Sequence, residues 1–281
     1  MAITFFAAAP ANAAPIRSDG SGNTVLLIHG FDPDGAADTN CAEYWGDAIT
    51  HFSKSGWNNV ATFGYYSSGP ENDCNFSYSG GTRETSITSI AKLLADTIYY
   101  SWTINNEKID VVAHSMGGLV IRSMLYHVAN GTPGWPTHLY IEDVVTLGTP
   151  HDGAAPEQVL LCRRVFLDQR QCTQMTPGSA FLRDLPETPS SGSPAFRTDW
   201  TVVSSFHDFT TGGNSGVGVN AGHKIQYQSD PKIGHSALKS LGSGSHRGKI
   251  WHKSVGAWSA WGGRAGPLEQ ARKAVYHQSS H

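Results

Sequence analysis

A serine at position 115 has the surroundings expected of a nucleophile. It stands in the run Ala113-His114-Ser115-Met116-Gly117-Gly118, after the apolar segment 109–113 and before apolar residues at helical spacing. A serine on a tight turn between a buried strand and a helix has its hydroxyl held above the sheet. Such a turn accepts only small residues two places before and two places after the serine, as Ala113 and Gly117 are. The helix that follows directs its first N–H groups toward developing negative charge.

A serine hydroxyl needs a base to activate it, and the base needs a carboxylate to orient it. In folds with this kind of turn the chain order is serine, acid, histidine. His235 follows a glycine in a loop and precedes an apolar helical stretch, so we predict it as the general base. Asp208 follows the predicted strand at 200–204, and we predict it as the acid. The competing carboxylates are Asp199 at the other end of that strand, Asp230 close to His235 in sequence, and Asp152 after an earlier strand, which is the strongest rival.

The negative charge of a tetrahedral intermediate requires backbone N–H donors. We predict the N–H of Met116, the residue after the nucleophile, and the N–H of Phe31, in the loop after the first strong strand. Losing one such donor typically costs about 3 kcal/mol of transition-state stabilisation. We expect the preceding His29 to brace this loop rather than to react.

No cluster of metal-ligating residues stands out, so no cofactor and no metal are expected. His151 and Asp152 are adjacent, but two ligands do not make a zinc site, and we expect His151 to pack below the pocket. A calcium ion held by scattered carboxylates stays an open alternative, since its ligands leave no sequence pattern.

The elements around these residues alternate between strands and helices. Apolar runs predict strands at 24–28, 60–66, 109–113, 141–147, 200–204 and 224–228, and helical spacing predicts helices at 86–100, 117–128 and 267–276. This alternation is typical of a mostly parallel sheet flanked by helices. Residues 150–198, after the strand that ends near Leu147, lack strand patterning and are expected to form an insertion above the sheet. We expect three regions: 1–15, a signal-peptide remnant; 16–245, the domain with the Ser115 site; and 246–281, an extension without an assigned role.

Composition favours a loop-rich extracellular protein. The 281 residues suit one α/β domain, only 15% are charged, and 31 are glycine. The net charge near −3 and the absence of a basic stripe disfavour nucleic-acid binding. The apolar start that leads to Ala11-Asn12-Ala13 is typical of the end of a signal peptide, which favours secretion. We see no uncharged apolar run of about 18 residues, so we expect no transmembrane segment, and we expect a monomer.

The four cysteines, Cys41, Cys74, Cys162 and Cys172, form no CxxC motif, and in an exported chain they indicate two structural disulfides. Three pairings are possible. We favour Cys41–Cys74 and Cys162–Cys172 because each pair brackets one polar segment between elements. Each bond is expected to stabilise the fold by roughly 3 kcal/mol. Free buried thiols are the alternative.

Four motifs together resemble bacterial α/β-hydrolase lipases and esterases: the loop at His29, the turn at Ser115, the run Leu147-Gly148-Thr149-Pro150-His151, and Gly234-His235. The turn with alanine in first place is similar to that of small Bacillus-type lipases, and the Gly-rich, disulfide-bearing character is similar to that of actinobacterial secreted lipases. The resemblance covers about residues 24–240. It implies the α/β-hydrolase fold, a triad of Ser115, Asp208 and His235, and oxyanion roles for Phe31 and Met116.

The resemblance implies a secreted carboxylic ester hydrolase, a lipase acting on triacylglycerols or long-chain esters at an oil–water interface. The alternatives on the same fold are a phospholipase, a polyesterase, a short-chain esterase and an acyltransferase, and a non-catalytic binding relative is a further class. The insertion is longer than in the small Bacillus-type pattern. Its apolar runs Val159-Leu160-Leu161, Val165-Phe166-Leu167 and Phe181-Leu182 predict either a lid or an ordinary packed excursion.

Overall fold

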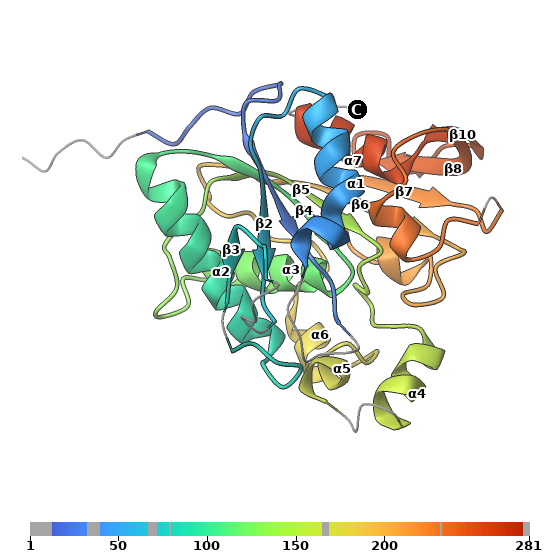
Figure 1. Ribbon diagram of the computed structural model, residues 1–281, viewed down its shortest axis with the longest axis horizontal. Helices are drawn as coiled ribbons and strands as arrows, with labels where there is room; N and C mark the ends of the chain where they lie inside the picture. Colours follow the sequence, from blue (N-terminus) through green and yellow to red (C-terminus); the bar gives the residue numbers. More distant parts are fainter. Residues whose placement is uncertain are drawn as a thin grey trace, which may run out of the picture.

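The computed structural model describes residues 13–32, 40–66, 72–78, 80–164, 169–230 and 232–277. Most of the expected signal-peptide remnant therefore lies outside the described residues. Within them, ten strands form one sheet in the order β10-β8-β7-β6-β5-β4-β1-β2-β3, with β9 paired to β8 (Figure 1). The strands are β1 Thr24–Ile28, β2 Val60–Gly64, β3 Phe76–Ser77, β4 Ile109–His114, β5 Ile141–Leu147, β6 Asp199–Ser205, β7 His223–Tyr227, β8 Ser245–His252, β9 Ala257–Trp258 and β10 Gly262–Ala265.

Seven neighbouring strands of this sheet run parallel, as the alternation of elements predicted. In spatial order they are β7, β6, β5, β4, β1, β2 and β3. The central strands β4 and β5 are buried along their whole length, which explains why their sequences are nearly continuous apolar runs. All carboxyl ends of these parallel strands meet at one edge of the sheet. The loops after β1, β4, β5, β6 and β7 therefore converge there, including those with Phe31, Ser115, Asp208 and His235.

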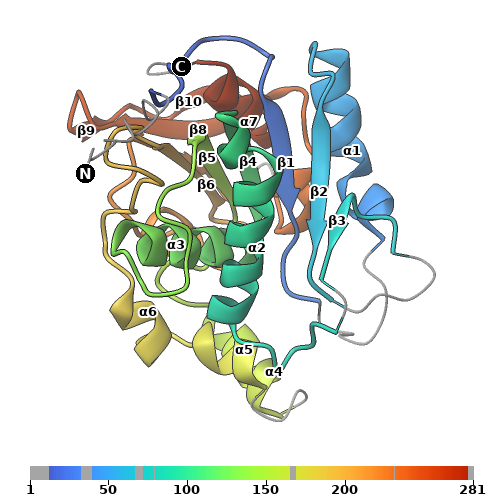
Figure 2. The same cartoon turned by 90° about the vertical axis from the view of Figure 1, so that its left-hand side faces the viewer.

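Helices cover both faces of the sheet (Figures 1 and 2). One face packs against α2 (Ile87–Ser101) and α3 (Met116–Ala129), and the other against α1 (Cys41–Lys54) and α7 (Pro267–Tyr276). Short 3-10 turns occupy Thr103–Asn105, Ser215–Val217 and Ser236–Lys239. This confirms the predicted fold class, a mostly parallel sheet flanked by helices. No helix among the described residues has both the length and the apolar character needed to cross a bilayer.

Helix α1 was missed by the sequence analysis. It begins after Asn40, whose side chain accepts a hydrogen bond from the Glu43 N–H, and it buries Trp45, Ala48 and Phe52. These side chains are three and four residues apart, and this helical spacing could have indicated the helix from the sequence. The start of the helix is also capped by the Asp73 carboxylate, which accepts hydrogen bonds from the first two N–H groups.

Both predicted disulfides form. Cys41–Cys74 joins the start of α1 to the segment before β3, and Cys162–Cys172 joins α4 (Pro156–Arg164) to α5 (Arg170–Gln174). The pairing was right, but the reason given for the first pair was wrong. Residues 41–74 hold a whole helix and a strand, rather than one polar segment between elements.

Residues 150–198, which the sequence analysis predicts to be an insertion, lie between β5 and β6 and hold α4, α5 and α6 (Ala180–Asp184), at the bottom of Figure 1. Its apolar runs differ in burial. Leu160 and Leu161 are 48% and 40% exposed, whereas Leu182 is buried in the core. Residues 165–168, which include Val165-Phe166-Leu167, lie outside the described residues.

The C-terminal region, which the sequence left without a role, completes the sheet. Strand β8 pairs antiparallel with β7, β10 pairs antiparallel with β8, and α7 packs on the α1 face. The predicted helix at 267–276 is confirmed with the same bounds. Three strands were missed there because Gly-rich and Trp-rich segments at a sheet edge lack a clear two-residue alternation.

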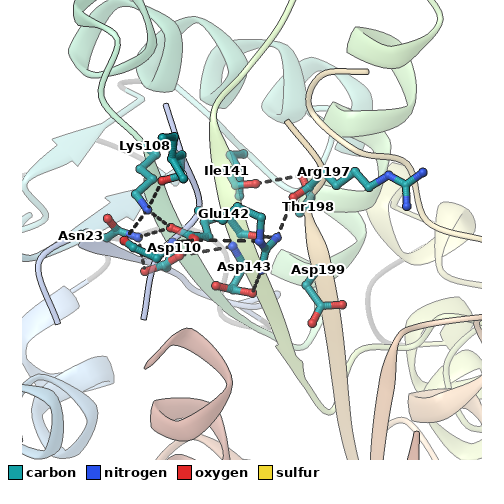
Figure 3. Close-up of polar contacts among 12 residues, drawn as sticks. Asn23, Lys108, Asp110, Ile141, Glu142, Asp143, Arg197, Thr198 and Asp199 are labelled. Atoms are coloured by element: carbon teal, nitrogen blue, oxygen red, sulfur yellow. Dashed lines mark hydrogen bonds and ion pairs between the residues drawn. The ribbon is translucent and has the colours of Figure 1, made fainter. Parts of the chain in front are cut away.

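Three buried carboxylates, Asp110, Glu142 and Asp143, lie at the amino edge of the sheet, opposite the loops described above (Figure 3). Arg17 donates to the Asp143 carboxylate at 3.0 Å, and the Asn23 side chain donates to both Glu142 and Asp110 at 2.8 and 3.1 Å. Burial, together with the charge of Glu142, raises the pKa of Asp110 to about 8. The segment before β1 is therefore fixed to the sheet by a polar cluster.

Candidate active site

Ser115 occupies a strained turn between the buried strand β4 and helix α3. Its backbone has φ 55° and ψ −130°, and among the described residues Asn106 is the other non-glycine residue with positive φ. The Ser115 N–H donates to the Leu147 carbonyl at 2.9 Å, which fixes the turn above the end of β5. A backbone held in such a sparsely populated conformation is typical of a functional position.

Gly117 explains why this turn needs small residues. A Cβ atom at position 117 would lie 2.5 Å from the His29 carbonyl oxygen and 2.6 Å from that of Ile28. Both atoms belong to the backbone and cannot move aside. The first turn of α3 thus packs directly against the end of β1, and this contact brings the loop with Phe31 next to Ser115.

His235 and Asp208 are held together as a pair. The Nδ1 atom of His235 lies 2.8 Å from Oδ2 of Asp208, which is 2% exposed. The other carboxylate oxygen accepts hydrogen bonds from the N–H groups of Thr210 and Thr211, at 2.9 and 3.0 Å. The Thr211 hydroxyl donates to the Gly148 carbonyl at 2.7 Å. The carboxylate is therefore fixed on one side and directed at the imidazole on the other.

The rival carboxylates have other surroundings. Asp199 sits at the amino end of β6 and pairs with His223 at 3.1 Å. Asp152 lies near Arg122 and Lys224, and Asp230 is exposed. Of the four candidates, the structure pairs Asp208 with His235.

Ser115 and His235 line one cavity of about 370 Å³ at the carboxyl edge of the sheet. Its wall also contains Phe31 from the loop after β1. Apolar side chains from the insertion complete it, among them Ala154, Leu161 and Met175. A space of this size, with polar groups set in a wall whose area is mostly apolar, is typical of a small-molecule site. The N–H groups at the start of α3, beginning with Met116, have no carbonyl of their own helix to bond.

A hydrogen-bonded chain that the sequence analysis missed links the two loops beside Ser115. The Gly30 N–H donates to the Tyr44 hydroxyl at 3.0 Å, and that hydroxyl donates to Nδ1 of His114 at 2.5 Å. Nε2 of His114 in turn donates to the His235 carbonyl at 3.1 Å. Burial and the neighbouring His235 hold the pKa of His114 well below its usual value, so its ring is neutral. The partners are far apart in sequence, and no local pattern could have indicated them.

His29 braces the loop after β1, as expected. Its Nδ1 donates to the Gly30 carbonyl at 2.7 Å, and its Nε2 accepts from the Tyr65 N–H at 3.1 Å. The ring stacks on Tyr65 with centroids 3.8 Å apart. Burial lowers the pKa of His29 to about 4, so the ring stays neutral. His151 is also buried, and its Nε2 lies 3.0 Å from the Thr146 hydroxyl.

Comparison with family models identifies residues 19–163 as a PGAP1-like alpha/beta domain. This chain belongs to that family. The matched segment is slightly more than half of the chain. It includes Phe31, Ser115 and Met116 of this PGAP1-like domain and ends before Asp208 and His235. A search of curated proteins finds no match.

The PGAP1-like chain also has distant likenesses among solved structures. The mature form of the Bacillus licheniformis lipase BlEst2 is 16% identical, with a TM-score of 0.43 over 69% of this chain and 70% of that one. The phospholipase PlaB from Legionella pneumophila is 13% identical, with a TM-score of 0.43 over 66% of this chain and 40% of that one. A thermophilic esterase from Thermogutta terrifontis is 13% identical, with a TM-score of 0.42 over 79% and 86%.

Proposed function

We propose that this protein is a serine carboxylic ester hydrolase. Ser115 is the nucleophile, His235 the general base and Asp208 the carboxylate that orients and stabilises the imidazole. The observation that carries the proposal is the strained turn at Ser115, which shares a cavity with a histidine whose Nδ1 is bonded to a buried carboxylate at 2.8 Å. With Nδ1 engaged in this way, Nε2 is the nitrogen that can take a proton from the Ser115 hydroxyl.

The reaction proceeds in two halves. The Ser115 oxygen attacks the ester carbonyl carbon while Nε2 of His235 takes the hydroxyl proton, and the Phe31 and Met116 N–H groups stabilise the oxyanion. The intermediate collapses, the imidazolium gives its proton to the departing alcohol, and an acyl-enzyme remains. A water molecule then attacks the acyl carbon with His235 again as base, which releases the carboxylic acid and restores the Ser115 hydroxyl.

A lipid ester is the substrate that we propose. Support comes from the apolar wall of the cavity and from exposed apolar side chains beside it, since Leu161 of α4 lines the cavity and is 40% exposed. An acyl chain can occupy such a wall, and α4 is the segment that we propose as a lid. The two disulfides are consistent with secretion, which we propose as well. A triacylglycerol or another long-chain ester fits this description.

Hydrolysis of p-nitrophenyl esters tests the proposal. The protein is expected to give a burst of p-nitrophenol, and Ser115→Ala is expected to abolish turnover while the circular dichroism spectrum stays unchanged. Ser53→Ala, an exposed serine of α1, is the matched control and keeps full activity. Full activity in Ser115→Ala would contradict the assignment of the nucleophile.

A second experiment resolves the substrate class. Rates are compared on an ester chain-length series, run above and below substrate solubility, and on emulsified triglyceride, phosphatidylcholine and a polyester. Preference for emulsified long-chain ester supports the lipase. Preference for phosphatidylcholine, for polyester or for soluble short esters would instead indicate a phospholipase, a polyesterase or a short-chain esterase that uses the same catalytic groups.

A further inference from the structure

The end of the sheet formed by β8, β9 and β10 carries basic and aromatic side chains together. Figure 2 shows these strands at the opposite end of the sheet from β2 and β3. Between residues 245 and 266 the chain has four cationic residues, Arg247, Lys249, Lys253 and Arg264, and no aspartate or glutamate. The same stretch holds three of the eight tryptophans, Trp251, Trp258 and Trp261. The overall net charge of −3 conceals this local excess of positive charge.

Lys249, Trp258 and Trp261 form a compact group at the centre of this region. The Lys249 ammonium lies 4.3 Å from the ring centroid of Trp258 and 5.0 Å from that of Trp261. Arg264 donates to the Ser259 hydroxyl at 2.8 Å and so holds the connection between β9 and β10. The rings and the ammonium group therefore keep a defined arrangement. We call Phe206, Lys249, Trp258 and Trp261 the tryptophan–lysine surface.

This surface is partly open to solvent, with Lys249 and Trp261 half-buried and the turn beside them exposed. All residues from 253 to 260 are exposed, with Val255 at 70% and Trp258 at 36%. Within the part of the chain that the structure describes, no carboxylate forms an ion pair with Arg247, Lys249 or Lys253. Exposed aromatic rings beside positive charge that has no anionic partner complement a surface that is both apolar and anionic.

The tryptophan–lysine surface is connected to the candidate active site by one short loop. Phe206, 39% exposed, contacts Trp261 with ring centroids 6.3 Å apart. Two residues further along the chain is Asp208, and Thr210 and Thr211 line the cavity with Ser115. Phe209, between them, is 67% exposed. Aromatic side chains thus lead from the cavity to the basic end of the sheet.

We infer that the tryptophan–lysine surface docks the protein on an anionic lipid bilayer. Tryptophan rings favour the boundary between headgroups and acyl chains, and Lys and Arg side chains bind anionic headgroups. An acidic soluble polymer would satisfy the charges but not the exposed rings. The inference rests on the proposed function in one respect, the lipid ester that the docked protein would reach. Docking itself requires no hydrolysis.

Vesicle co-sedimentation tests the inference directly. The full chain carrying Ser115→Ala, which cannot alter the lipid by the proposed reaction, is mixed with vesicles of phosphatidylcholine alone or of phosphatidylcholine with phosphatidylglycerol. Binding is expected to the phosphatidylglycerol vesicles and to weaken with added salt. Lys249→Ala is expected to lower partitioning about fivefold. Trp258→Ala is expected to lower it to a similar degree and to reduce the shift of tryptophan fluorescence on binding.

Matched controls come from surfaces elsewhere on the molecule. Lys54→Ala at the end of α1 and Tyr100→Ala on α2 remove an exposed cation and an exposed ring, and both are expected to bind as the parent does. Hydrolysis of a soluble p-nitrophenyl ester by the same variants with Ser115 restored checks their folding. It also separates a failure of docking from a failure of the proposed function.

Three results would overturn the inference. One is equal partitioning onto both kinds of vesicle. Another is a loss of binding with Lys54→Ala as large as that with Lys249→Ala. The third is binding to immobilised heparin without binding to phosphatidylglycerol vesicles, which would replace the bilayer by a soluble polyanion.

Discussion

The Tyr44 hydroxyl joins the loop after β1 to His114 and, through it, to the backbone of His235. Tyr44→Phe keeps the ring that lines the cavity but leaves the Gly30 N–H and Nδ1 of His114 without their partner. An unsatisfied buried polar group costs about 1–3 kcal/mol. Because Tyr44 lines the cavity, a water molecule can restore part of the lost hydrogen bonding. We therefore expect the free energy of unfolding to fall by about 2 kcal/mol.

The same substitution is expected to lower kcat about tenfold with little change in KM, because the hydroxyl bonds the protein and not the substrate. Complete removal of an oxyanion donor costs about 100- to 1000-fold, and a loosened loop costs less. Urea unfolding and p-nitrophenyl ester kinetics measure the two effects, with Tyr100→Phe on the surface of α2 as control. Unchanged stability together with unchanged kcat would refute the role assigned to this chain of hydrogen bonds.

Three further predictions concern carboxylates and a glycine. Asp208→Asn is expected to lower kcat by about 1000-fold or more while the fold persists, because His235 loses the partner that fixes its tautomer. Stopped-flow ester kinetics measures this loss, and a loss below tenfold contradicts the prediction. Gly148→Ala is expected to lower both stability and activity, since position 148 has φ +60° and a Cβ there would lie 2.9 Å from the Asp208 carboxylate. A melting temperature and an ester-hydrolysis rate equal to those of the parent would oppose this. The raised pKa of Asp110 means that the folded state binds its proton more tightly than the unfolded state, so stability falls as pH rises from about 4 to about 8. Asp110→Asn is expected to flatten this part of the curve of unfolding free energy against pH, and an unchanged slope would count against it.

The sequence predicted the features whose causes are local. The turn at Ser115 needs a buried strand, a small residue two places before and two places after the serine, and a following helix, and all are visible within about twenty residues. Asp208 was selected because it follows the strand before the last parallel one, and the structure indeed places it against His235. The main parallel strands were located to within two residues, apart from the short β3, which was missed.

The features that the sequence did not indicate depend on contacts between distant segments. The hydrogen bonds of Tyr44 involve residues 30 and 114, and no spacing rule connects those positions. Strand β8 alternates poorly between buried and exposed residues because it lies near the edge of the sheet, so its sequence carries no clear period. The cation–π group of Lys249 depends on the β9–β10 connection lying beside β8, which only the fold supplies.

Covalent labelling with a fluorophosphonate probe is the most direct test of the central claim, that Ser115 is a nucleophile activated by His235. We expect one adduct per chain, located by mass spectrometry on the peptide that contains Ser115, with much slower labelling in His235→Ala and none in Ser115→Ala. A folded protein that fails to react, or an adduct on a different serine, would contradict it.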